Sequence, residues 1–284
     1  MINSILYFPL LKVGATTLRG RNACSVKQTI AGLQWVERRT EILRSFEARS
    51  RIVEETNGLV LWDTPKGPYW IPKRDNPHIL NELSEQENHL YGSGEWAVHA
   101  GDIVLDCGTN NGVFTQTALL AGARLVVAID PAPDSIEALG RTFSKEIADG
   151  RVIVYPKGVW DKDDFLVLDN SANSLDDSVV MHEGKGSGLK VSLTTIDKLV
   201  AELKLPRVDF IKMDIEGAER QALAGARQTI AVHKPRLAIA TEHLPDDPEQ
   251  IPILVRTLWS GYRMQCGPCY GLHGRMAPDV QYFR

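Results

Sequence analysis

A glycine-rich loop that follows a short apolar run is the first candidate site for chemistry. Residues 103–112 read Ile-Val-Leu-Asp-Cys-Gly-Thr-Asn-Asn-Gly. Gly108 and Gly112 carry no side chain, as a tight turn and a closely bound ligand require, and Asn110 lies between them. The free N–H groups of a helix that begins here favour a carboxylate, and Asp106 can accept hydrogen bonds from an ammonium group. A plain turn between a strand and a helix is the alternative.

A second carboxylate, Asp130, closes the next apolar run, 24 residues after Asp106. An acid at this position of a nucleotide-binding fold hydrogen-bonds the hydroxyls of a ribose. Pro131 and Pro133 restrict the backbone that follows. We therefore expect Asp130 to bind the ribose of an adenosine cofactor, and the alternative is an aspartate that caps a helix or a turn.

Charged side chains gather at the end of a later apolar run. Residues 208–219 read Val-Asp-Phe-Ile-Lys-Met-Asp-Ile-Glu-Gly-Ala-Glu. Lys212, Asp214 and, if the strand persists, Glu216 share one face because strand side chains alternate. His243 ends another apolar run and can act as a general base near neutral pH. We expect Asp214, Glu216 or His243 to orient a substrate or to accept its proton. The alternatives are a structural salt bridge and a capping histidine.

Other catalytic motifs are absent or incomplete. A nicotinamide-binding loop reads G-x-G-x-x-G, whereas Gly108 and Gly112 have no third glycine in register. The chain also lacks a G-x-S-x-G nucleophile elbow and a P-loop. Cys266-Gly-Pro-Cys269 has the spacing of a redox motif, but the following residues do not predict the helix that such a motif needs. Cys266, Cys269 and His273 have no fourth zinc ligand nearby, so we predict a turn and no metal site.

These residues need a framework, and from residue 101 short apolar runs alternate with helical patterns. Such alternation is typical of a parallel sheet with helices on both faces. The predicted strands are 103–106, 125–130, 152–155, 208–214 and 237–241. The predicted helices are 112–121, 134–148, 195–203, 217–230 and 248–260. Residues 159–191 predict a strand-and-loop insertion, and residues 262–284 predict one or two last strands.

The residues before 101 follow other patterns. Apolar side chains at helical spacing predict an amphipathic helix over 26–56. Residues 59–72 predict a hairpin that turns at 64–67, and a short helix is expected around 79–91. We therefore divide the chain into a helical N-terminal extension (1–57), a hairpin and lid-like segment (58–100) and a main domain (101–284).

The composition and charge of the chain limit the classes of partner that it can bind. The content of 43% hydrophobic and 24% charged residues is ordinary for a soluble globular protein, and no apolar run is long enough to span a bilayer. Residues 1–57 carry a net charge of +4 and the remainder −8, so the body of the protein is a poor match for nucleic acid. The basic segment can contact an acidic partner, an anionic membrane surface or the acidic body itself. Four cysteines predict no disulfide scaffold and favour a cytoplasmic location.

Together these blocks resemble the FkbM family of methyltransferases over roughly residues 87–260. The resemblance lies in residues 101–115, 128–133 and 193–199, and it is strongest over 209–219. It implies an α/β, Rossmann-like class I methyltransferase fold, with a mostly parallel seven-stranded sheet, helices on both faces and here a helical N-terminal extension. It also implies S-adenosyl-L-methionine as cofactor and O-methylation of a hydroxyl on a sugar, polyketide or other small metabolite.

The resemblance assigns the cofactor site to matching positions of this chain. These residues are Asp106, Gly108, Asn110, Gly112, Asp130, Gly158 and Val159. The chain departs from the family at Thr109 and Asn111, where Ala and Ile are common, and at Gly158, where Ala tends to precede Val. A catalytically silent binding protein on the same fold and a nicotinamide-dependent oxidoreductase are the alternatives. The acceptor, a small molecule or a glycan, and the oligomeric state are not identified by the sequence.

Overall fold

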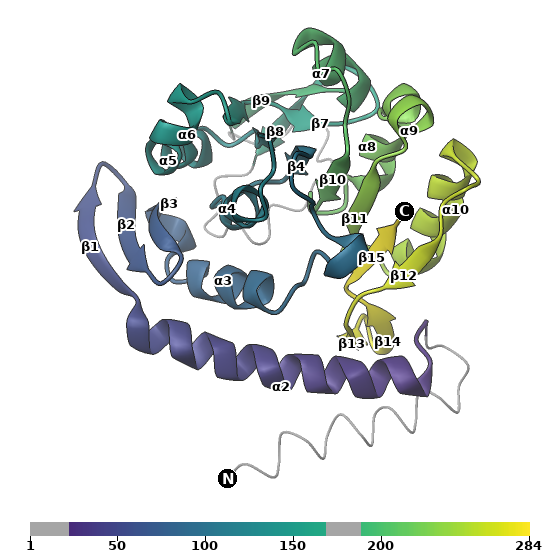
Figure 1. Cartoon of the computed structure of the whole chain (residues 1–284), viewed down its shortest axis with the longest axis horizontal. Helices are drawn as coiled ribbons and strands as arrows, with labels where there is room; N and C mark the ends of the chain where they lie inside the picture. The colour runs from purple at the N-terminus through teal and green to yellow at the C-terminus, as the bar shows by residue number, and fades with distance from the viewer. Residues whose placement is uncertain (1–22, 169–188) are drawn as a thin grey trace.

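A seven-stranded sheet forms the centre of the computed structural model, which describes residues 23–168 and 189–284 (Figure 1). The strands are β4 (Ile103–Cys107), β5 (Leu125–Ile129), β6 (Val152–Tyr155), β10 (Phe210–Met213), β11 (Arg236–Ala240), β12 (Met264–Cys266) and β15 (Val280–Phe283). Their order is β12-β15-β11-β10-β4-β5-β6. Five strands are parallel, while β15 is antiparallel to β11 and to β12. The order reverses between β4 and β10, and sheets of this type bind ligands at the carboxyl ends of such strands.

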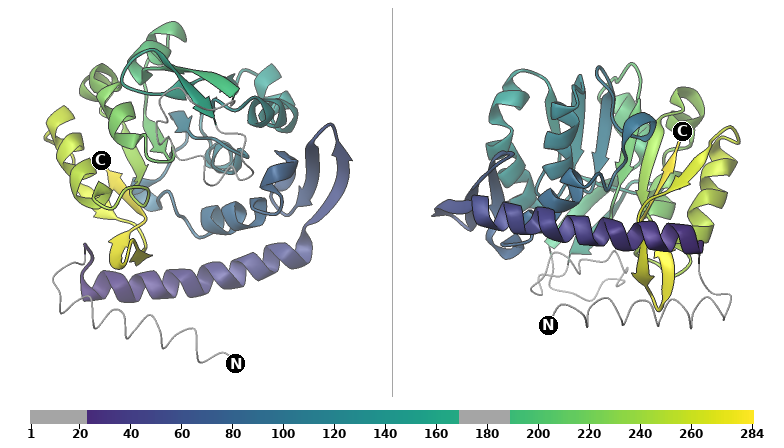
Figure 2. Two further views of the ribbon diagram at one scale, coloured as in Figure 1. Left: turned by 180° about the vertical axis from the view of Figure 1, so that it is seen from behind. Right: turned by 60° about the horizontal axis from the view of Figure 1, so that its bottom comes forward.

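Helices cover both faces of this sheet (Figure 2). They are α4 (Val113–Leu120), α5 (Pro133–Thr142), α6 (Ser144–Ala148), α7 (Ile196–Glu202), α8 (Glu219–Ala224), α9 (Arg227–His233) and α10 (Asp247–Leu258). Fully buried Ile196, Ile230 and Ile251 belong to the apolar core under α7, α9 and α10. Buried Phe114 and Leu139, from α4 and α5, belong to a second core on the opposite face. Burial of a strand on both faces explains its near-continuous apolar sequence.

The predicted strands and helices of this domain are confirmed, but two predicted helices are each divided in two. The helix predicted over 134–148 breaks at Phe143, which separates α5 from α6. The helix predicted over 217–230 breaks after α8 at Gly225. A Cβ atom on Gly225 would lie 2.0 Å from the carbonyl oxygen of Trp160, so the chain passes too close there for any side chain. Apolar spacing continues across both breaks, which is why the sequence did not predict them.

A long helix, α2 (Val26–Arg49), lies along one side of the molecule (Figures 1 and 2). Ser25 and Gln28 form a reciprocal capping box at its start. The prediction of a helix to residue 56 is wrong, because Ser50 is extended and residues 51–56 form a strand. That strand is stabilised by pairing with another strand, which the helical spacing of the sequence does not reveal.

The segment after α2 forms a three-stranded antiparallel sheet of β1 (Arg51–Thr56), β2 (Leu59–Thr64) and β3 (Gly67–Pro72). The predicted hairpin over 59–72 is thereby confirmed. A 3-10 turn η1 (Lys73–Asp75), the helix α3 (Ile79–Glu87) and a second 3-10 turn η2 (Gly94–Trp96) lead to β4. Strands pair across residue 57, where we placed a domain boundary, and that boundary stays a prediction.

The remaining strands form two small sheets. In the insertion, β7 (Gly158–Val159), β8 (Asp164–Leu168) and β9 (Leu189–Thr194) pair in the order β7-β9-β8. Part of the predicted insertion, residues 169–188, lies outside the described residues. Near the C-terminus, β13 (Cys269–Leu272) and β14 (Arg275–Pro278) form a hairpin between β12 and β15. The last region thus has four strands rather than the one or two predicted.

One disulfide, between Cys24 and Cys269, joins the start of α2 to the hairpin β13–β14. The cysteine count did not predict it, because the partners are 245 residues apart in sequence. Cys266 and Cys269 flank the turn between β12 and β13, as predicted. Among the described residues, no helix is long and apolar enough to cross a membrane.

Candidate active site

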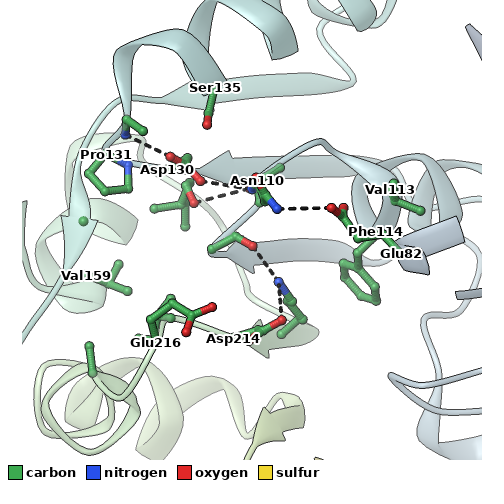
Figure 3. Close-up of a pocket in the computed structure, with 18 of the residues that line it drawn as sticks. Glu82, Asn110, Val113, Phe114, Asp130, Pro131, Ser135, Val159, Asp214 and Glu216 are labelled. Carbon is green, nitrogen blue, oxygen red and sulfur yellow. Dashed lines mark hydrogen bonds and ion pairs between the residues drawn. The ribbon is translucent and has the colours of Figure 1, made fainter. Parts of the chain in front are cut away.

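A cavity of about 490 Å³ opens at the carboxyl ends of β4, β5 and β10. This volume is within the range of about 300–1,000 Å³ that is typical of small-molecule sites. The predicted residues that line it are Gly108, Asn110, Asp130, Gly158, Val159, Asp214 and Glu216 (Figure 3). Asp106, Gly112 and His243 lie behind this wall. Helix α3 supplies the opposite side of the cavity, through residues that the sequence did not single out.

The glycines of the 106–112 loop are required by close packing. Gly108 has a φ of 77°, and a Cβ atom on it would lie 1.8 Å from the carbonyl oxygen of Asp214. Gly112 has a φ of 80°, and a Cβ atom on it would lie 2.5 Å from Phe143. Both backbone conformations favour glycine. The loop is therefore pressed between the end of β10 and α5, and only its Gly108–Asn110 side faces the cavity.

Asp106 has a structural position that the sequence did not predict. Its side chain is fully buried, accepts a hydrogen bond of 2.7 Å from the Thr115 hydroxyl and lies 3.5 Å from Lys212 Nζ. Lys212 Nζ also donates to the Gly108 carbonyl oxygen at 2.6 Å. These contacts hold β4, β10 and the loop together. Asp106 is not among the residues that line the cavity.

Asp130 joins the loop to the cavity wall. Its Oδ2 accepts a hydrogen bond from the Asn110 amide at 3.0 Å, and its Oδ1 accepts one from the Ala132 amide at 2.9 Å (Figure 3). Burial raises the pKa of Asp130 to about 6, although both amides favour the ionised form. Each carboxylate oxygen can accept a further hydrogen bond, so Asp130 can still bind two neighbouring hydroxyls.

Glu82 of α3 lies beside Asn110 of the loop and lines the cavity (Figure 3). Its Oε1 accepts hydrogen bonds from the side-chain amides of Asn110 at 3.2 Å and Asn111 at 2.6 Å (Figure 3). Burial raises the pKa of Glu82 to about 8, while the Asn111 hydrogen bond opposes that rise. Asn111, one of the loop positions where the chain departs from the FkbM pattern, thus contacts this acid. Glu82 is a cavity carboxylate that the sequence analysis missed.

Glu85, one turn further along α3, extends this acidic wall. Burial raises its pKa to about 7, and the Arg39 guanidinium, 2.5 Å away on α2, opposes that rise. Glu242 lines the cavity as well, and burial beside Asp279 raises its pKa to about 10. The spacing of Glu82 and Glu85 places them on one helix face, but only the packing of α3 shows that this face meets the cavity.

Asp214 and Tyr91 connect the catalytic candidates to the lid-like segment. The Tyr91 hydroxyl donates a hydrogen bond to Asp214 Oδ2, and Lys212 Nζ lies 3.8 Å from the same oxygen. Burial alone would raise the pKa of Asp214, but Lys212 and His243 hold it below its ordinary value. Asp214 is therefore a fixed anion at the cavity wall.

Glu216 and His243 lie beside Asp214. Glu216 does not reach this position as part of a continuing strand, which was the condition that the sequence analysis set. β10 ends at Met213, and Glu216 has a left-handed backbone with a φ of 55°. His243 Nε2 lies 3.5 Å from Asp214 Oδ1 and 3.4 Å from Glu216 Oε2. Its Nδ1 lies 3.0 Å from Oε1 of the fully buried Glu219. The three predicted catalytic residues thus come together, with His243 behind the two carboxylates.

The charges in this cluster shift two more pKa values. Burial and the neighbouring Asp214 raise the pKa of Glu216 to about 7. Burial alone would lower the pKa of His243, but Glu219, Asp214 and Glu216 raise it to about 10. His243 is therefore cationic at neutral pH when only these groups surround it. The sequence suggested that His243 accepts a proton near neutral pH, a role that requires the neutral imidazole.

Comparisons with known proteins identify the family of the chain and a similar fold. The family model of the methyltransferase FkbM domain matches residues 106–264. The fold is similar to methyltransferase FkbM from Methylobacillus flagellatus KT, with 20% identity and a TM-score of 0.51 over 72% of this chain and 53% of that chain. This chain therefore spans about half the length of that protein. It is also similar to a SAM dependent methyltransferase from Aquifex aeolicus, with 18% identity and a TM-score of 0.39 over 74% of this chain and 95% of that chain. No curated protein matches the chain.

Proposed function

The chain belongs to the FkbM family of methyltransferases, and from this we propose that it transfers a methyl group from S-adenosylmethionine to a hydroxyl of a small-molecule or glycan acceptor. One observation carries the proposal. The glycine loop, Asp130 and the Asp214–Glu216 pair line a single cavity at the reversal point of a class I methyltransferase sheet.

The groups on the cavity wall match the parts of this cofactor. Asp130 suits the two ribose hydroxyls, and Gly158 with Val159 leaves an apolar edge for the adenine. The first turn of α4, where Val113 and Phe114 line the cavity, suits the methionine carboxylate. Glu82 suits the ammonium group, a role for which Asp106 is too deeply enclosed.

The acceptor side of the cavity lies at Asp214 and Glu216. When bound, the cofactor supplies an activated sulfonium methyl group, so the chief task of the protein is to place the acceptor oxygen in line with it. An alcohol must also lose its proton, and a carboxylate within hydrogen-bond reach can take it. Asp214 and Glu216 reach the cavity, whereas His243 acts through them and is therefore a positioning residue.

Cofactor binding is tested first, by calorimetry with S-adenosylhomocysteine. We expect Asp130→Ala to weaken binding about tenfold or more, because charge-assisted hydrogen bonds contribute about 1.5–3 kcal/mol. Asp149→Asn is the control, since Asp149 is exposed and contacts Lys145 on α6. Unchanged affinity in Asp130→Ala would contradict the assigned site.

Methyl transfer is tested second, with tritiated-methyl cofactor and pools of hydroxylated metabolites and glycans. We expect label to enter an acceptor, and Asp214→Asn to reduce the turnover at least about tenfold. A protein that binds the cofactor analogue but labels no acceptor in any pool would be a silent binding protein on this fold.

A further inference from the structure

We infer that Asp214, Glu216 and His243 form a binding site for a divalent cation of the Mg²⁺/Mn²⁺ type on the acceptor side of the cavity. The inference rests on the proposed function only for the role of the ion. Its basis is a set of one imidazole and two carboxylates whose ligand atoms all lie within 4.8 Å of one another.

The spacing of the ligand atoms suits one shared ion. Two atoms that each bind an ion at about 2.1 Å lie at most about 4.2 Å apart. The Nε2 atom of His243 meets this limit with both carboxylates, at 3.5 Å from Asp214 and 3.4 Å from Glu216. Oxygen-rich sets with one imidazole suit Mg²⁺ and Mn²⁺ better than thiophilic ions.

Groups outside the set hold two of the ligands in position. The buried Glu219 carboxylate contacts Nδ1 of His243 and so turns Nε2 toward the two carboxylates. Tyr91 donates to Oδ2 of Asp214 and leaves Oδ1 facing His243. Metal-binding histidines regularly have such a carboxylate on the other ring nitrogen. A simple ion pair between His243 and the two carboxylates would require neither the Glu219 contact nor the Tyr91 hydrogen bond.

Further acidic side chains surround the three candidate ligands, and a bound cation would stabilise their ionised forms. Besides Asp214 and Glu216, carboxylates from three other elements face this part of the cavity or stand behind it: Glu82, Glu85, Glu219 and Glu242. The basic side chains that line the same cavity are Arg39, Arg74, His78 and Lys212, and His243 lies behind its wall. Buried carboxylates in excess are costly unless they are paired or bind a metal. A neutral imidazole binds a metal, so the ion takes the place of the proton on His243.

The bound ion defines a class of acceptor. Three protein ligands leave positions open for the acceptor, and a hydroxyl that coordinates a divalent cation loses its proton more readily. An acceptor that presents two neighbouring oxygen atoms, as in a vicinal diol or an α-hydroxy ketone, would fill two of these positions. Glu216 is then a ligand and not the proton acceptor, and the proton that the coordinated hydroxyl loses passes to solvent water.

Mn²⁺ binding to the full chain, without cofactor, is measured by electron paramagnetic resonance, in which protein-bound Mn²⁺ loses the sharp signal of the free ion. We expect one site per chain, weakened at least about tenfold by Glu216→Gln and by His243→Ala, and also weakened by Glu219→Gln, which removes the negative charge behind Nδ1 of His243. The matched control is Glu249→Gln, an exposed acid that contacts Arg275. Circular dichroism checks the fold of every variant.

The outcomes separate this inference from the proposed function. Mn²⁺ affinity equal to wild type in both Glu216→Gln and His243→Ala, or no Mn²⁺ binding by the wild type, overturns the cation site. S-adenosylhomocysteine binding is measured separately in EDTA, and its absence overturns the proposed function whatever the Mn²⁺ result. Methyl transfer that EDTA abolishes and Mn²⁺ restores supports both.

Discussion

At the scale of single residues, Asp106 has a position different from the one that the sequence suggested, and Glu82 has a place in the cavity that the sequence did not suggest. Asp106 lies one residue before the end of β4, where the family pattern places a cofactor contact, yet its carboxylate contacts Thr115 and Lys212. Glu82 comes from a helix outside the sequence motifs and lines the cavity beside the loop. We therefore expect Glu82 to bind the cofactor ammonium, while Asp106 maintains the shape of the loop.

This exchange of roles predicts a selective effect of Glu82→Gln. We expect S-adenosylhomocysteine to bind about tenfold more weakly to this variant, because a charge-assisted hydrogen bond is lost. Methylthioadenosine, which lacks the amino-acid group, should bind the variant and the wild type alike. Calorimetry with both ligands measures the difference, and an equal loss for both would show that Glu82 supports only the fold.

The pKa of Glu82 adds a pH dependence to the same measurement. Its value of about 8 means that the acid is mainly protonated at pH 6 to 7 in the free protein. An ammonium ligand requires the carboxylate, so the affinity for S-adenosylhomocysteine should rise from pH 6 to pH 8 and proton release should accompany binding. Glu82→Gln should remove that dependence.

At the scale of secondary-structure elements, the basic helix α2 packs against the acidic body. It contacts α3 through Arg39 and Glu85 and the hairpin β13–β14 through the Cys24–Cys269 disulfide. Gly32 permits the approach, since a Cβ atom there would lie 1.8 Å from the Cys269 carbonyl oxygen. From the sequence, the basic segment could contact an acidic partner, an anionic membrane surface or the acidic body. In the structure, α2 contacts the acidic body.

The disulfide should contribute measurably to stability. In a urea titration, reductant should lower the free energy of unfolding of the wild type by about 2–4 kcal/mol, as is typical for a disulfide that closes a long loop. Cys24→Ala should resemble the reduced wild type and ignore reductant. Cys266→Ser, which leaves the disulfide intact, should remain sensitive to it. A wild type that unfolds identically with and without reductant would show that the bond adds nothing.

Elements whose cause is local were predictable from the sequence, and those with a distant cause were not. Apolar runs and helical spacing located β4, β5, β10 and the helices between them, because each pattern lies within a few residues. The strand β1 was predicted as helix because it depends on pairing with β2. Glu82 was missed because its partner Asn110 is 28 residues away in sequence. The sequence of the loop does not indicate that α3 packs against it.

At the scale of the whole molecule, acidic groups are concentrated in and around the cavity, while α2 supplies part of the opposite charge. Burial raises the pKa of Glu82 to about 8 and that of Glu85 to about 7, from an ordinary value of 4.5. Between about pH 4.5 and pH 8 the folded protein therefore binds more protons at these sites than the unfolded chain. These acids favour the folded state at low pH and oppose it as the pH rises.

The melting temperature, measured in EDTA and without ligand, should accordingly fall from pH 5 to pH 8. Glu82→Gln should make this fall shallower, because one of the acids with a raised pKa no longer titrates. Glu137→Gln, an exposed acid on α5 that contacts Arg141, should leave the slope unchanged. A melting temperature that rises over the same interval would contradict this account of the cavity charge.

The bond between Cys24 and Cys269 also decides how the molecule carries mechanical load. Tension applied at the two chain ends passes from residue 24 to residue 269 through the sulfur–sulfur bond. Six strands of the central sheet, β4, β5, β6, β10, β11 and β12, lie inside this covalent ring and bear none of the pull, whereas β15 lies outside it and remains under tension. Reduction of the bond places every strand from β1 to β12 under tension.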